Sequence, residues 1–193
     1  KAEEALRAAV AEANTEIHQR GQNNPEFHNM GTTASSLAIL PTGAVVAHVG
    51  DSRVYRLRKG VLEQLTFDHS LVWEMEASGH GDSGVWGPTI PKNVITRSLG
   101  PNSNVEVDVE GPFPVDPGDR FLICSDGLTS FVEDQEIGTL MDCLSEAQAA
   151  RVMVDLANLR GGSDNITVLI IHANEGSVQS GASTKHSPRD QRP

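Results

Sequence analysis

Three aspartates stand at the ends of apolar runs in this 193-residue chain. Asp51 and Asp126 each follow such a run, and Asp164 precedes one. Short apolar runs of this kind predict strands, and a carboxylate at the end of a strand is held by the sheet while it faces solvent. Carboxylate oxygens are the ligands that hard divalent cations prefer. The three positions therefore indicate one metal site at the rim of a sheet, and a metal-dependent enzyme is the first hypothesis.

Each aspartate also has a simpler explanation. Asp126 precedes Gly127, and Asp-Gly is a favoured turn pair. Asp51 is also typical of a tight turn in which the carboxylate caps its own backbone. Asp164 is equally typical of a residue that begins a strand. Only the position that the three aspartates share, at strand ends, favours the metal hypothesis.

Composition limits the classes of protein to consider. The chain has the length of one domain, and 38% of its residues are hydrophobic, which favours a packed core. Its 15 basic and 26 acidic residues give a net charge of −11, which argues against nucleic acid or an anionic membrane as the main partner. No apolar run approaches the roughly 20 residues of a membrane span. Cys124 and Cys143 are expected to be buried free thiols, which favours a reducing compartment and a cytoplasmic location.

The hydrophobic pattern predicts an α+β protein. Helices are expected at residues 2–20, 70–78, 134–143 and 146–159, the first of them ended by Gly21. Strands are expected at residues 32–40, 43–49, 53–58, 61–65, 104–110, 120–125 and 165–173. The strand at 43–49 is apolar on both faces, so we expect layers on both of its sides. The strands follow one another with helices before and after them, which predicts an antiparallel β-sandwich flanked by helices on both sides.

Two segments have no clear period. Residues 79–92 are rich in glycine and proline, which predicts a long loop that either carries function or is an ordinary surface excursion. Residues 174–193 contain little apolar content and are expected to be a disordered tail.

Six blocks in this order resemble the metal-dependent protein phosphatases of type 2C (the PPM family) in their bacterial form. The blocks lie at residues 31–34, 47–55, 65–70, 94–100, 116–128 and 162–168. Six ordered blocks are far more specific than any one of them. The resemblance covers about residues 2–173, so residues 1–173 are expected to form one domain of this type.

The resemblance implies the function and the site. It implies hydrolysis of phosphoserine and phosphothreonine in proteins by a metal-activated water, with two Mg²⁺ or Mn²⁺ ions and room for a third. Asp126 and Asp164 would be ligands of the two main ions, and Asp51 would help to hold the third. Asn165 would support a ligand without binding metal itself, and the loop at 79–92 would be a mobile flap. Phosphorylated proteins are the implied partners, together with a cognate serine/threonine kinase, and the protein is expected to be a monomer.

One block of that family is absent from the chain. The family pattern includes an Asp-Gly-x-Gly-Gly element whose aspartate bridges the two metals, and an earlier arginine that binds phosphate. Here Asp-Gly occurs only at 126–127 and Gly-Gly only at 161–162, and neither fits the element. We therefore expect the bridging aspartate, the arginine and the first strands of the sandwich upstream of Lys1. No catalytic residue can then be assigned within the chain, whose own activity stays in question.

Two other functions are compatible with these residues. One is a non-catalytic interaction or regulatory module with the phosphatase fold, and the other is an unrelated Ca²⁺-binding sandwich. Retention of three aspartates at one rim argues against an abandoned site. His48 and His69 are not assigned to metal, and His48, within an apolar strand, is expected to be packed and hydrogen-bonded.

Overall fold

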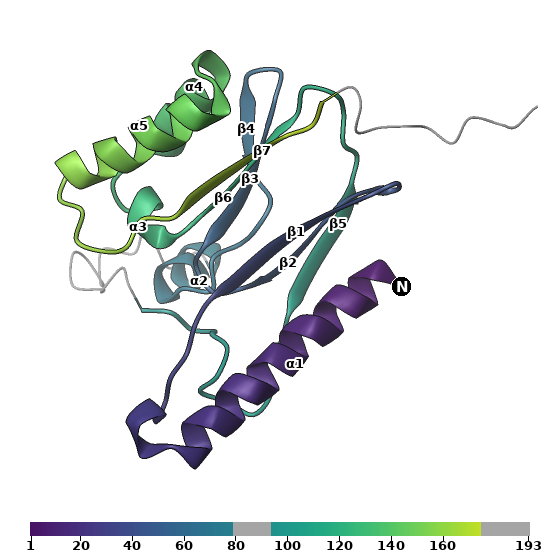
Figure 1. Cartoon of the computed structure of the whole chain (residues 1–193), viewed down its shortest axis with the longest axis vertical. Helices are drawn as coiled ribbons and strands as arrows, with labels where there is room; N and C mark the ends of the chain where they lie inside the picture. Colours follow the sequence, from purple (N-terminus) through teal and green to yellow (C-terminus); the bar gives the residue numbers. More distant parts are fainter. Residues whose placement is uncertain (79–93, 175–193) are drawn as a thin grey trace, which may run out of the picture.

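The computed structural model describes residues 1–78 and 94–174, which form two antiparallel sheets packed between helices (Figure 1). The strands are β1 (Ala34–Leu40), β2 (Gly43–Val49), β3 (Arg53–Arg58), β4 (Val61–Gln64), β5 (Asp108–Phe113), β6 (Arg120–Cys124) and β7 (Val168–His172). The helices are α1 (Ala2–Asn23), the 3₁₀ turn η1 (Pro25–Phe27), α2 (Leu71–Ala77), α3 (Asp126–Thr129), α4 (Asp134–Cys143) and α5 (Glu146–Leu159). The first sheet has the order β1-β2-β5 and the second the order β4-β3-β6-β7. The predicted α+β sandwich is therefore confirmed.

Strand β2 shows why the first sheet needs cover on both sides. All of its residues are buried. Successive side chains of a strand point to opposite faces, so a strand without exposed residues must be covered twice. On one face Val46 packs with Val54 and Phe121 of the second sheet. On the other face Ala47 and its neighbours pack in a cluster that includes residues of α1.

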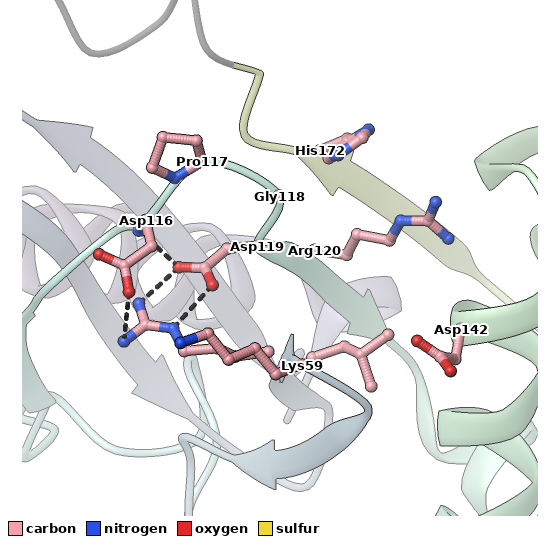
Figure 2. Close-up of a pocket in the computed structure, with 10 residues that line it drawn as sticks. Lys59, Asp116, Pro117, Gly118, Asp119, Arg120, Asp142 and His172 are labelled. Atoms are coloured by element: carbon pink, nitrogen blue, oxygen red, sulfur yellow. Dashed lines mark hydrogen bonds and ion pairs between the residues drawn. The ribbon is translucent and has the colours of Figure 1, made fainter.

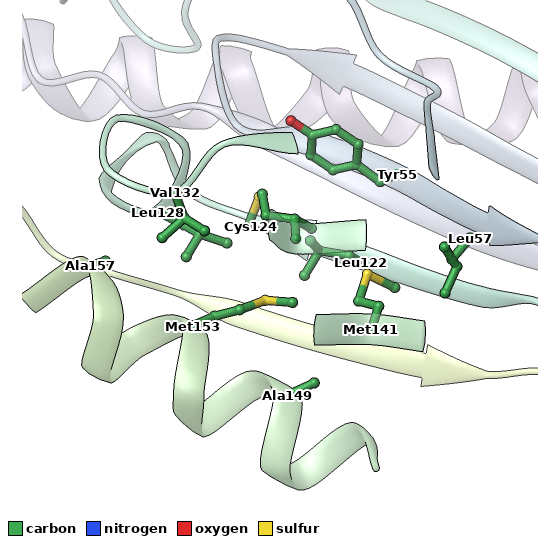
Figure 3. Close-up of a cluster of buried hydrophobic side chains, with 11 residues drawn as sticks. Tyr55, Leu57, Leu122, Cys124, Leu128, Val132, Met141, Ala149, Met153 and Ala157 are labelled. Carbon is green, nitrogen blue, oxygen red and sulfur yellow. The ribbon is translucent and has the colours of Figure 1, made fainter. Parts of the chain in front are cut away.

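Helices α4 and α5 cover the outer face of the second sheet (Figures 1 and 3). Ala149, Met153 and Ala157 lie four residues apart on α5 and are all fully buried, so they form one apolar stripe. The stripe packs in the same cluster as Tyr55 and Leu122 of the sheet. Burial of a large side chain such as Met153 or Leu122 stabilises the fold by about 2 kcal/mol. The sandwich thus holds the strand ends, where the candidate site lies, on a rigid support.

Several predicted boundaries were wrong. Helix α1 does not end at Gly21 but continues to Asn23, because Gly21 is buried against the turn that follows the helix. The strand expected at 104–110 begins only at Asp108 and continues to Phe113. Val105 and Val107 nevertheless pack in the same cluster as α1. The alternation of apolar and polar residues at 104–107 therefore reflects burial of the valines, although these residues do not belong to a strand. The last strand is also shorter than expected and begins at Val168.

The two cysteines differ from each other. Both are free thiols, and Cys124 is buried as expected. Cys143, at the end of α4, is exposed, so the prediction that it is buried was wrong. The expected flap at 79–92 and the expected tail lie outside the described residues, except for Asn174. In the ranges that the structure describes, no helix has both the length and the apolar character needed to cross a membrane.

Candidate metal-binding site

Asp51 and Asp126 meet in one cavity at an end of the second sheet. Asp51 lies between β2 and β3, and Asp126 follows β6 and begins α3. Because Arg53 pairs with Cys124 across the antiparallel β3 and β6, the two aspartates leave the sheet at the same end. The cavity has a volume of about 390 Å³. Its lining residues are Asp51, Arg53, Asp68, Ser70, Val72, Trp73, Glu76, Asp126, Thr129 and Ser130.

The electrostatics of this cavity suit a cation. The Asp51 side chain is largely buried, at 9% exposure. Burial raises its pKa, and the negative charge of Asp126 raises it further. Two carboxylates that repel each other in a partly buried cavity are stabilised by a positive ion between or beside them.

The fit to a metal is nevertheless partial. In the described ranges, no three histidine, cysteine, aspartate or glutamate residues stand close enough together to hold a metal ion. Asp51 and Asp126 provide oxygen ligands of the right chemistry, but they are two ligands of a coordination shell that needs at least six. The cavity therefore fits part of a divalent cation site.

Asp164 does not line this cavity. It is exposed, in the segment between α5 and β7, and its carboxylate accepts a hydrogen bond of 2.7 Å from the Asn165 amide. The segment is still tied to the end of β6, because Ser125 Oγ donates to the Asn165 carbonyl at 3.0 Å and accepts from the Thr167 amide at 2.9 Å. Asn165 thus meets the Asp126 turn through its backbone. The structure brings the Asp164 segment beside Asp126 but does not bring its carboxylate to Asp51.

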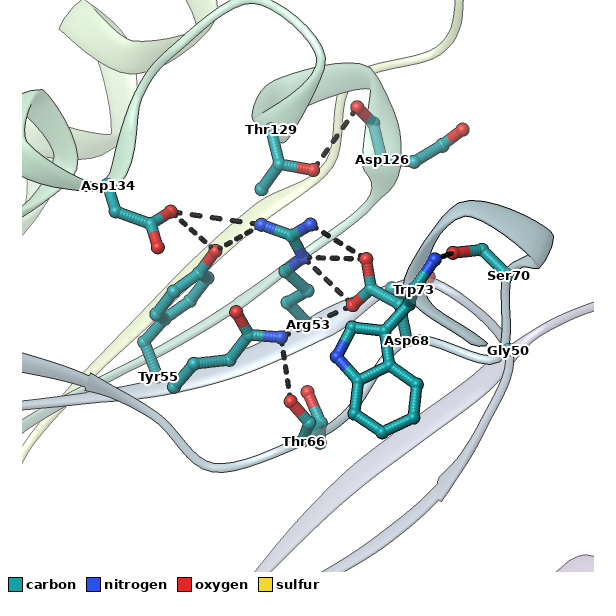
Figure 4. Close-up of polar contacts among 12 residues, drawn as sticks. Gly50, Arg53, Tyr55, Thr66, Asp68, Ser70, Trp73, Asp126, Thr129 and Asp134 are labelled. Carbon is teal, nitrogen blue, oxygen red and sulfur yellow. Dashed lines mark hydrogen bonds and ion pairs between the residues drawn. The ribbon is translucent and has the colours of Figure 1, made fainter. Parts of the chain in front are cut away.

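Arg53 lines the cavity and holds several of its neighbours through hydrogen bonds (Figure 4), a role that the sequence did not reveal. Its guanidinium donates to both oxygens of Asp68, at 2.7 to 3.0 Å, and to the Tyr55 hydroxyl at 3.0 Å. The Tyr55 hydroxyl in turn donates to Asp134 at 2.9 Å. Arg53 stands two residues after Asp51, which was a usable signal, but its partner Asp68 could be found only from the tertiary structure. A fork-shaped pair of this kind fixes the β3 end of the cavity to the segment before α2.

A second cavity, of about 410 Å³, lies at the other end of β3 and β6 (Figure 2). One of its cations is paired with two of its acids: Arg58 binds Asp116 at 3.1 Å and Asp119 at 2.6 Å. Arg120 donates to backbone carbonyls of α4 and its C-cap. These polar groups bind other groups of the protein and so have a structural role. The cavity with Asp51 therefore remains the candidate site.

The two unassigned histidines are both buried beside the Asp51 turn. His48 is 2% exposed, its Nε2 donates to the Gly50 carbonyl, and its Nδ1 lies 2.9 Å from the Ser35 hydroxyl. Burial lowers the pKa of His48 to about 4, and the neighbouring His69 lowers it as well. The prediction that His48 is packed and hydrogen-bonded is confirmed.

Comparisons with known proteins agree with this fold. Residues 1–79 match the model of the family described as Protein phosphatase 2C. A protein of Streptococcus pyogenes serotype M6, named as protein phosphatase 2C-type, is 38% identical over 171 residues, which are 88% of this chain and 69% of that protein. The solved serine/threonine phosphatase of S. agalactiae superposes with a TM-score of 0.79 at 34% identity, over 88% of this chain and 69% of that one.

A third comparison concerns metal. The catalytic domain of the serine/threonine protein phosphatase PstP, solved with 2 manganese ions, gives a TM-score of 0.74 at 30% identity, with 88% of this chain and 70% of that chain covered. The similarity in structure to the S. agalactiae phosphatase and to PstP extends over 88% of this chain, which includes its helix-flanked sandwich. The chain belongs to the protein phosphatase 2C family, among its bacterial PPM-type serine/threonine phosphatases. It spans about two thirds of the length of the relatives that it matches. The predicted family and enzyme class are confirmed.

Proposed function

We propose that the intact protein is a metal-dependent phosphatase that hydrolyses phosphoserine and phosphothreonine in other proteins. The observation that carries this proposal is the meeting of Asp51 and Asp126 in one acidic cavity. Two carboxylates that repel each other at the end of a sheet can be stabilised by a divalent cation, whose preferred ligands are carboxylate oxygens. The family membership and the two manganese ions in the PstP structure support the same function.

The roles proposed for the residues are those that the family resemblance implies, and the cavity that Asp51 and Asp126 share supports two of them. Asp126 and Asp164 would hold the two main Mg²⁺ or Mn²⁺ ions, and Asp51 would contribute to a third. When bound, such ions supply the positive charge that activates water and neutralises phosphate oxygens. The hydrogen bonds of Ser125 support the role of Asp164, because they hold its segment beside Asp126. The remaining ligands, including the bridging aspartate, would come from outside residues 1–193.

The proposal extends to partners and compartment. An acidic protein with a charge of −11 can accept a phosphorylated protein only where cations offset its own charge, which a metal site provides. A cognate serine/threonine kinase would supply such substrates, and the phosphatase would act as a monomer. The free thiols of Cys124 and Cys143 support the cytoplasm as the compartment.

The test is the loss of one proposed ligand in the intact protein. Asp126→Ala should lower Mn²⁺-dependent hydrolysis of a phosphothreonine peptide by about 100-fold or more, since removal even of groups that only support a ligand costs about 10- to 100-fold. Asp155→Ala removes an exposed carboxylate of α5 and should leave turnover unchanged. Unchanged turnover in Asp126→Ala would contradict the proposal. Absence of both hydrolysis and Mn²⁺ binding in the unmodified protein would favour the non-catalytic module.

A further inference from the structure

The peptide of Gly50, directly before Asp51, is held between two buried histidines. The Gly50 amide donates to Nδ1 of His69 at 3.0 Å. The Gly50 carbonyl accepts from Nε2 of His48 at 2.9 Å and from the His69 amide at 2.8 Å. The N–H and the C=O of Gly50, which belong to the peptide bonds on either side of its Cα, are thus both bonded by His48 and His69.

The backbone at this point cannot be fixed by a side chain of its own. Gly50 has φ of +118°, a region that other residues rarely adopt. A Cβ added there would lie 2.3 Å from the side chain of Thr33. Glycine is therefore required, and glycine is also the residue that loses the most conformational freedom when it is ordered. The hydrogen bonds from outside supply the restraint that the missing side chain cannot.

Each histidine ring is anchored on its far side to the first sheet. Nδ1 of His48 lies 2.9 Å from the hydroxyl of Ser35, on β1. Nε2 of His69 lies 2.9 Å from Asp108, on β5, and Arg97 also binds that carboxylate. Because the Gly50 amide donates to Nδ1, the neutral His69 ring carries its hydrogen on Nε2, which donates to Asp108, and the Arg97 guanidinium lies 3.0 Å from the same nitrogen. The rings therefore connect β1 and β5 to the two backbone groups of Gly50.

Asp51 needs such a restraint. Its carboxylate is nearly buried and is repelled by Asp126, so in the absence of a cation the pair would separate if the backbone could yield. We propose that His48 and His69 are positioning residues, which clamp the backbone of Gly50 on both sides of its Cα and so hold the Asp51 carboxylate beside Asp126 ready for a cation. The inference rests on the proposed function only in the role that it gives to Asp51.

The test compares replacement of each histidine by leucine with its replacement by a polar residue whose hydrogen-bonding atom lies at the same distance along the side chain. In asparagine, Oδ1 stands as many bonds from the backbone as Nδ1 of histidine, so His69→Asn keeps an acceptor for the Gly50 amide while His69→Leu does not. By the same count, His48→Gln keeps a donor for the Gly50 carbonyl and His48→Leu removes it. The control is Asn14→Leu, because Asn14 is 1% exposed and likewise holds a glycine amide, that of Gly100, through its side chain.

Two measurements on the intact protein decide the matter. Calorimetric titration with Mn²⁺ should show an affinity about tenfold weaker, or more, in His69→Leu and His48→Leu, and recovery of most of this loss in His69→Asn and His48→Gln. Asn14→Leu should lower Tm without this change in affinity. Equal effects on Mn²⁺ affinity in His69→Leu and Asn14→Leu, or no recovery in the polar variants, would overturn the inference.

Amide hydrogen exchange separates this inference from the proposed function. In metal-free protein, the Gly50 amide should exchange at least about tenfold faster in His69→Leu than in His69→Asn, because only asparagine keeps it bonded. If the unmodified protein neither binds Mn²⁺ nor hydrolyses phosphopeptides, the proposed function fails. The exchange rate of the Gly50 amide then tests by itself whether His69 holds the Gly50 backbone. Unchanged exchange in His69→Leu would show that the clamp does not exist.

Discussion

The Asp119 carboxylate is 1% exposed, and Arg58 is the main group that stabilises its negative charge. Arg58 donates to both of its oxygens, at 2.7 and 2.6 Å, and the Asp116 amide donates at 2.8 Å (Figure 2). Burial by itself would raise the pKa of Asp119, but these hydrogen bonds outweigh it, and the pKa lies below its usual value. At the residue scale, the pair ties the end of β3 to the turn that begins β6.

Arg58→Gln should therefore destabilise the protein in a pH-dependent way. With its pKa lowered in the fold, Asp119 contributes stability above its unfolded pKa, and this contribution is lost as pH falls through the folded pKa. We expect the free energy of unfolding to fall by about 2 kcal/mol at pH 7 and the difference to shrink below roughly pH 4. Urea denaturation at pH 7 and pH 3 measures both values.

The matched control for this prediction is Arg151→Gln. Arg151 and Asp155 form an exposed pair on α5 with a separation of 3.9 Å. Such pairs contribute at most about 0.5 kcal/mol, so this variant should be nearly neutral at both pH values. A loss in Arg58→Gln that does not depend on pH would show that Arg58 stabilises the fold through packing and not through the charge of Asp119.

At the scale of elements, the short helix α3 is placed by a close approach of backbone. A Cβ added to Gly127 would lie 2.4 Å from the carbonyl oxygen of Asn165. The same carbonyl accepts a hydrogen bond from Ser125, so it cannot move away freely. Gly127 therefore lets the segment with Asp164 lie against the turn that begins with Asp126.

Gly127→Ala should push these two segments apart. We expect a loss of about 1–3 kcal/mol in the free energy of unfolding, the usual cost of overpacking, together with weaker Mn²⁺ binding by the intact protein. Thr139→Ala, at an exposed position of α4, should change stability by less than about 0.5 kcal/mol. If Gly127→Ala kept both stability and Mn²⁺ affinity, the contact with Asn165 would have no part in forming the site.

At the scale of the whole molecule, repulsion between the carboxylates of the acidic cavity lowers the free energy of unfolding when metal is absent. Asp126→Asn removes the repulsion on Asp51 while keeping the size of the side chain. We expect metal-free protein to gain about 1 kcal/mol of stability, because sites built for function commonly reduce stability by such amounts. Addition of Mn²⁺ should then raise Tm of the unmodified intact protein more than that of Asp126→Asn, because binding to the folded state stabilises it.

The control for net charge is Asp155→Asn, which makes the same change at an exposed position of α5. It should give no gain, since the effect at Asp126 comes from the nearby Asp51 and not from the overall charge of −11. Thermal unfolding with and without Mn²⁺ measures all three proteins. An equal gain in both variants would assign the effect to general charge repulsion.

Much of the fold could be predicted because its signals are local. The period of apolar residues placed α4 and α5 at their observed bounds, and it placed β2 as a strand buried on both faces. The errors occurred at residues that are buried although they do not form the predicted strand or do not end the predicted helix. Val105 and Val107 alternate like a strand but pack in the α1 layer without ladder pairing, and Gly21 packs inside the end of α1 where a helix stop was expected.

The sequence by itself determined the family, through six ordered blocks, and it selected Asp51 and Asp126 by their position after apolar strands. Only the tertiary structure decided that these two carboxylates share a cavity while the carboxylate of Asp164 does not. It also decided that His48 and His69 bind the peptide before Asp51. The physical reason is that strand period is a property of neighbouring residues, whereas hydrogen-bond partners and shared cavities depend on how β2, β3 and β6 are placed across two sheets.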